Sequence, residues 1–120
     1  MSGPQVTWLP GGQRLHLHHG PIDMIVGIDG PGRDTAFTRA AQRFETLLNE
    51  LAGELPRLRR PNGPAPKGET ARIMHRATRA FAPRFITPMA AVAGAGAETI
   101  LRAICDGPGI TRAYVNNGGD

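Results

Sequence analysis

The stretch that decides the fold is residues 15–28, LHLHHGPIDMIVGI. Leucines alternate with histidines over residues 15–18, which is the period-two pattern of a strand with one buried face. A Gly-Pro pair at 20–21 interrupts the pattern, and the apolar run after it is typical of a second, more buried strand. The stretch therefore predicts a hairpin within residues 13–28, preceded by a loose lead-in at residues 1–12 that is rich in Gly and Pro.

Apolar side chains recur at helical spacing in two segments that follow the hairpin, and Thr87-Pro88 is the start signal of a third helix. The first helix is predicted from a cap at Asp34 or Thr35 to a stop at Pro56, and two more helices are predicted at 70–83 and 88–105. Irregular chain is predicted at 59–68, and a strand at 110–116. The order of elements predicts an α+β fold, with an antiparallel sheet and helices packed on one face.

Length and composition bound the class of protein. The chain has 120 residues, one cysteine and a formal net charge of +4. The length fits one domain over residues 1–120, with its core at 13–120, and a single cysteine excludes a disulfide-stapled secreted scaffold. The sequence has no apolar run near the roughly 18 residues of a membrane span and no secretory signal pattern. We expect a cytoplasmic protein that does not bind membranes.

The basic residues are thirteen arginines and one lysine. Such an excess fits recognition of phosphate or carboxylate. It also fits codon usage in a GC-rich genome, which is the favoured interpretation. Arg72, Arg76 and Arg79 form one stripe on the predicted second helix. Because the stripe lacks interleaved aromatic residues, it is poorly suited to reading bases. A solvated helix face is the favoured interpretation, and nucleic acid is not an expected partner.

The histidines and the single cysteine are the candidates for a metal site or a nucleophile. His16 and His18 share one face of the predicted strand, but nothing in the spacing brings Asp23 or His75 near them, so no metal site is predicted. Cys105 falls at the C-terminal end of a helix, where the helix dipole disfavours a thiolate, and we expect a core thiol there. Catalytic residues cannot be named from these patterns.

Two segments point to a ligand. Residues 90–97 are almost all Ala or Gly, and each helical glycine costs roughly 0.5 to 1 kcal/mol relative to alanine. Close approach of a flat ligand or tight packing on the sheet would compensate, and periodicity does not separate the two. The helix start at Thr87 offers free amides to an anion. Residues 116–120, NNGGD, follow a strand and are typical of either a phosphate-binding nest or an ordinary turn.

Three stretches together resemble a known family. They are RFITPMAAVAGA at 84–95, AYVNNGGD at 113–120 and LHHGPID at 17–23. In combination they resemble an uncharacterised family related to the ApbE flavin transferases, and the likeness covers residues 14–120.

This resemblance implies a flavin-nucleotide-binding, T-fold-like half-domain with FAD or FMN as cofactor. The cofactor-binding residues that it implies are Thr87, Pro88, Met89 and Ala90 at the helix start, with Asn117, Gly118, Gly119 and Asp120 in the loop. ApbE proteins transfer FMN from FAD onto a target protein with magnesium. The chain has no lysine near Ala93 and lacks the later segment that supplies the magnesium ligands in that family.

The chain thus resembles an incomplete domain that is inactive alone, with a missing C-terminal half or a second copy as partner. The alternative is a non-catalytic basic module that contacts nucleic acid or an acidic protein.

Overall fold

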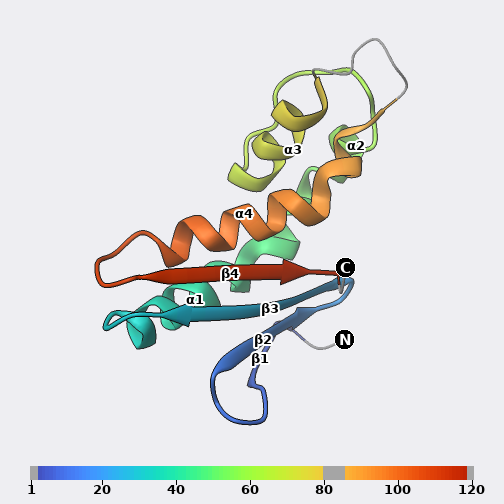
Figure 1. Cartoon of the computed structure of the whole chain (residues 1–120). Coiled ribbons are helices and arrows are strands. Elements are labelled where there is room, and N and C mark those ends of the chain that lie inside the picture. Colours follow the sequence, from blue (N-terminus) through green and yellow to red (C-terminus); the bar gives the residue numbers. More distant parts are fainter. Residues whose placement is uncertain (1–2, 80–85, 119–120) are drawn as a thin grey trace.

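Four antiparallel strands form one sheet in chain order (Figure 1). The computed structural model describes residues 3–79 and 86–118. The strands are β1 (Gln5–Trp8), β2 (Arg14–His19), β3 (Ile22–Asp29) and β4 (Arg112–Asn117). Leu17 pairs with Met24, and Val26 pairs with Val115, so their side chains share one face of the sheet. The predicted hairpin is confirmed as β2 and β3.

Strand β1 corrects the prediction of a loose lead-in at residues 1–12. Val6 pairs with Leu17 and Trp8 with Leu15, so the Val6 and Trp8 side chains lie on the same face of the sheet as these buried leucines, although both remain partly exposed. The Trp8 ring meets Phe37 edge-on, with 4.8 Å between ring centroids. Only four residues form this strand, between Pro4 and Pro10, so the alternation was too short to stand out.

The helical elements follow the predicted order with different boundaries. They are α1 (Arg33–Gly53), α2 (Leu55–Leu58), α3 (Glu69–Arg79), the 3-10 turn η1 (Pro88–Ala91) and α4 (Val92–Ile104). The caps predicted at Asp34 or Thr35 are wrong, because Gly32 is the cap and no side chain bonds the free amides. Pro56 does not end α1 directly but lies in the first turn of α2. The predicted end of the second helix, residues 80–83, lies outside the described residues.

Two copies of the tetrapeptide DGPG pack against each other where α1 begins and α4 ends. Residues 29–32 lead from β3 into α1, and residues 106–109 lead from α4 into β4. The Gly32 amide donates to the Gly109 carbonyl at 2.8 Å. A Cβ at Gly32 would collide with the Pro108 carbonyl, so glycine is required for this close approach.

The core lies between one face of the sheet and the helices α1 and α4 (Figure 1). Its fully buried side chains include Leu17, Met24, Phe44, Leu47 and Ile100, each 0% exposed. The α+β class with an antiparallel sheet and helices packed against it is therefore confirmed. In the described part of the chain, no helix is both long and apolar enough to cross a membrane.

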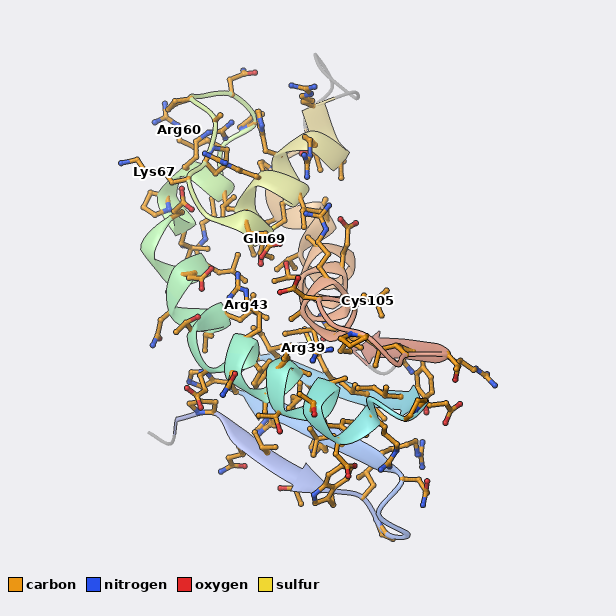
Figure 2. The ribbon with its side chains drawn as sticks, turned by 90° about the vertical axis from the view of Figure 1, so that its left-hand side faces the viewer. Arg39, Arg43, Arg60, Lys67, Glu69 and Cys105 are labelled. Carbon is orange, nitrogen blue, oxygen red and sulfur yellow. The ribbon has the colours of Figure 1, made fainter. Side chains whose placement is uncertain are left out.

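Polar contacts join the helices to one another. Arg39 donates to the carbonyls of Ala103 and Ile104 at 2.9 and 2.5 Å, which satisfies the free C-terminal carbonyls of α4. Arg43 pairs with Glu50 at 2.8 Å and with Glu69 of α3 at 3.3 Å (Figure 2). These contacts hold α1 against both α4 and α3.

Candidate functional site

A pocket opens where α1, the start of α4 and the end of β4 meet. Its volume is about 380 Å³. Most of its walls are apolar side chains, and the polar groups come from Arg59, Asn117 and the backbone of Gly118. The lining residues are Pro21, Ile22, Met24, Leu47, Leu48, Leu51, Ala52, Leu55, Arg59, Met89, Val92, Ala93, Gly96, Asn117 and Gly118. The pocket therefore suits a ligand with an apolar body and a small number of polar groups.

Asn117 joins the sheet to the helix on one side of the pocket. It pairs with Met24 across the sheet, which turns its side chain toward α4. There its Nδ2 donates to the carbonyl of Ala93 at 3.0 Å. This bond fixes the rotamer and the amide orientation of Asn117 beside the pocket.

Gly96 provides the space in which the Asn117 side chain lies. A Cβ on Gly96 would come within 3.2 Å of Met24 Cε and 3.4 Å of Asn117 Nδ2. Of the two compensations expected for the helical glycines, packing on the sheet is confirmed at Gly96. At Gly94 a Cβ would meet no atom within 4 Å. Nothing in the described contacts explains the glycine at that position.

Gly118 turns the chain away at the end of β4. Its φ of +86° lies in the left-handed region, which favours glycine. Its amide donates to the Asp23 carbonyl at 3.0 Å and so extends the pairing with β3 by one residue. The predicted loop thus begins at the pocket.

The structure brings together only some of the predicted binding residues. Met89, Asn117 and Gly118 line the pocket. Thr87, Pro88 and Ala90 do not, whereas Gly119 and Asp120 lie outside the described residues.

The start of α4 explains this difference. Residues 88–91 form a 3-10 turn, and the regular helix begins only at Val92. Pro88 is buried and Ala90 is exposed. Thr87 caps the turn without a side-chain hydrogen bond and does not line the pocket, so the predicted anion site is not part of it.

Sequence reasoning missed the wall that α1 contributes. Helical spacing predicts Leu47 and Leu51 on the apolar face of the first helix, and the sequence gives no sign that they or Arg59 border a cavity. All three line the pocket. Helical periodicity indicates which face of α1 is buried, but it does not indicate where the buried face leaves a gap.

His16, His18 and Asp23 form a polar surface on the face of the sheet opposite to the core. His16 Nε2 lies 2.5 Å from Asp23 Oδ1, and the rings of His16 and His18 stack with centroids 5.9 Å apart. The spacing alone did not bring Asp23 near His16, but the β2–β3 register does, because the two residues are diagonal neighbours in it. Across the described ranges, no three His, Cys, Asp or Glu side chains are grouped so that they could hold a metal ion.

The expectation of a buried Cys105 is also wrong. Its side chain is exposed at the C-cap of α4. Ile100 and Ile104 face the core at 0% exposure, and the next residue along the helix is rotated by about 100° from that face. Cys105 instead borders an open hollow next to the second DGPG turn.

Comparisons with known proteins identify the family. The family model described as AbpE bacteria matches residues 6–120. No curated protein matches the chain, and no solved structure matches it. The expected relation to the ApbE flavin transferases is wrong, since AbpE bacteria is a different family and the similar spelling is no evidence of kinship. With its sequence matched from residue 6 to residue 120, the chain belongs to the AbpE bacteria family.

Proposed function

We propose that this protein binds a small ligand with a flat, largely apolar body in the pocket between α1, α4 and β4. The single observation that carries the proposal is the pocket of about 380 Å³ with apolar walls. Its volume falls within the roughly 300–1,000 Å³ that is typical of small-molecule sites. A flavin nucleotide, FMN or FAD, is the ligand to test first.

The chemistry of the lining supports a flavin nucleotide. Leu48, Leu51 and Met89 present aliphatic and thioether surface, which packs well against a flat ring. Asn117 and the Gly118 backbone supply hydrogen-bonding groups for the polar edge of such a ring. Arg59 supplies a cation that attracts a phosphate group. Transferase chemistry is not part of the proposal.

Ala93 gives a direct test because it lines the pocket while its own side chain is exposed. Leucine at this position extends into the cavity without removing a core residue. We expect Ala93→Leu to weaken FMN binding at least tenfold, which corresponds to about 1.4 kcal/mol. Titration followed by flavin fluorescence measures the change.

Ala90→Leu is the matched control, since Ala90 is exposed and does not line the pocket. Its FMN affinity should equal that of the wild type. Failure of the wild type to bind riboflavin, FMN or FAD at millimolar concentration contradicts the flavin assignment. Equal FMN affinity of the wild type and Ala93→Leu contradicts the assignment of this pocket as the binding site.

A further inference from the structure

Positive charge is concentrated in one quarter of the chain. Residues 54–79 carry seven basic and two acidic side chains, a net charge of +5, whereas the whole chain has +4. The rest of the molecule is therefore close to neutral. These residues form α2, the irregular segment 59–68 and α3, which lie together at the end of the molecule away from β1 (Figures 1 and 2).

Five of the seven cations form what we call the basic surface: Arg59, Arg60, Lys67, Arg76 and Arg79. All five side chains are exposed. Within residues 3–79 and 86–118, none of them takes part in an ion pair. Figure 2 shows Arg60 and Lys67 at this end of the molecule.

The two acidic residues of the segment, Glu54 and Glu69, contact groups other than these five cationic side chains. Glu54 accepts hydrogen bonds from the amides of Lys67 and Gly68 at 2.7 and 2.9 Å. Glu69 pairs with Arg43 at 3.3 Å and with Arg102 at 3.7 Å. Among the described residues, neither carboxylate forms an ion pair with a side chain of the basic surface.

The other two arginines hold the surface in shape. Arg57 donates to the carbonyls of Arg60, Gly63 and Pro64. Arg72 donates to the Pro66 carbonyl at 3.2 Å. These bonds tie the irregular segment to α2 and α3, so the five exposed cations belong to one supported surface.

Two arginines of residues 54–79 also act on the side chain of His75. Burial is the largest cause that lowers the pKa of His75 below its ordinary value, and the charges of Arg57 and Arg79 lower it further. Arg57 belongs to α2 and Arg79 to the end of α3. Both helices therefore place an arginine close enough to act on the same imidazole.

We infer that the basic surface binds the phosphate backbone of double-stranded nucleic acid without reading its sequence. Four of its five cations are arginines, whose guanidinium groups bind phosphate oxygens in pairs. Residues 54–79 contain no Phe, Tyr or Trp, so base stacking on a single strand is not available from this segment. Contacts to backbone phosphates position a duplex and carry no sequence information. This inference departs from the expectation that nucleic acid is not a partner.

Other anionic partners fit the surface less well. Membrane binding by a basic surface is strengthened by apolar side chains that insert beside it. In the described part of the chain, the exposed large apolar side chains are Val6, Trp8 and Tyr114, which all belong to strands. A protein partner commonly requires aromatic or apolar anchors at the centre of the interface, and the same observation applies to it.

The test is fluorescence anisotropy of a labelled 20-base-pair DNA duplex titrated with the chain between 50 and 200 mM NaCl. If about four phosphates are contacted, the affinity should fall about 100-fold over this range. The variant Arg76→Gln/Arg79→Gln should bind at least tenfold more weakly at 50 mM NaCl and with a shallower dependence on salt. Both positions are outside the pocket, so this result is separate from flavin binding.

The control is Arg14→Gln/Arg112→Gln, which removes the same charge from two exposed arginines of the sheet. It should bind the duplex within twofold of the wild type. No duplex binding at 50 mM NaCl overturns the inference, as does an equal loss in both double variants. Tighter binding to poly-glutamate or to phosphatidylserine vesicles than to the duplex also overturns it.

Discussion

The side-chain amide of Asn117 donates a 3.0 Å hydrogen bond to the carbonyl oxygen of Ala93. The bond joins the last residue of β4 to the second residue of α4, and both residues line the pocket. A Cβ on Gly96 would lie 3.4 Å from the Asn117 amide nitrogen and 3.2 Å from Met24 Cε, so there is little spare room beside this bond.

Replacing Asn117 with aspartate tests this relationship. A carboxylate cannot donate to the Ala93 carbonyl and instead repels it, so we expect a loss of about 1 to 3 kcal/mol in the free energy of unfolding. Urea denaturation measures the loss. Asn116→Asp is the control, because Asn116 is exposed on the opposite face of β4. An equal effect of the two substitutions contradicts the role of Asn117.

The two glycines of α4 should respond in opposite directions to alanine. At Gly94 a Cβ meets open space, so Gly94→Ala should stabilise the protein by about 0.5 to 1 kcal/mol through helix propensity. At Gly96 the same gain is offset by crowding of Met24 and Asn117, and Gly96→Ala should be destabilising. Thermal unfolding of both variants compares them directly. Similar stabilisation by both would show that Gly96 is not needed for packing.

A buried hydroxyl pair holds α3 against α4. Thr70 Oγ1 lies 2.6 Å from Thr99 Oγ1, and Thr99 Oγ1 also donates to the Ala95 carbonyl at 2.9 Å. Because the Thr99 proton is used in that second bond, the Thr70 hydroxyl is the donor between the two threonines. Thr99→Val leaves a buried donor without a partner and should cost about 1 to 3 kcal/mol.

Removal of both hydroxyls should cost less than the sum of the single changes. The variants Thr70→Val, Thr99→Val and the double variant form a cycle that measures this coupling by denaturation. Strict additivity of the single effects would contradict a hydrogen bond between the two residues.

The Glu50 carboxyl makes stability depend on acidity. Burial by itself raises the pKa of Glu50, but hydrogen bonds from Arg43 and Thr46 and the charge of Arg43 outweigh burial and lower it below its ordinary value. A lowered pKa contributes stability above the ordinary pKa of the carboxyl, and this stability is lost as the pH falls through the folded-state pKa. Glu50→Gln should therefore flatten the fall in stability below about pH 4.5.

Denaturation midpoints between pH 3 and pH 7 measure this dependence. Glu45→Gln is the control, since Glu45 is an exposed carboxylate of the same helix. If both variants follow the wild-type profile, the ion pair of Glu50 with Arg43 does not contribute to acid sensitivity.

The sequence predicts those parts of the fold whose signals are local. The alternation of leucines and histidines is sufficient for the β2–β3 hairpin, and the small residues around Gly96 indicate a close approach to α4. Strand β1 escapes prediction because four residues between prolines carry too little periodicity. The phase of α4 decides that Cys105 is exposed, and that phase depends on how Ile100 and Ile104 pack against other segments.

Only two segments of the candidate site, those around Met89 and Asn117, can be predicted from the sequence. Met89 and Asn117 belong to segments whose glycines and small residues indicate a binding site. Leu48 and Arg59 reach the pocket through the long-range packing of α1 and α2, for which no local pattern exists. The resemblance to ApbE proteins rested on short glycine- and alanine-rich stretches, and these did not separate one family from another.

The most direct test of the central claim is a two-dimensional amide NMR spectrum of the chain recorded during titration with FMN. We predict that the amide signals of Met89, Ala93, Gly96, Asn117 and Gly118 shift with a common dissociation constant, while those of β1 remain in place. Shifts that cluster on another part of the molecule, or no shifts at millimolar FMN, would contradict a flavin-binding pocket between α1, α4 and β4.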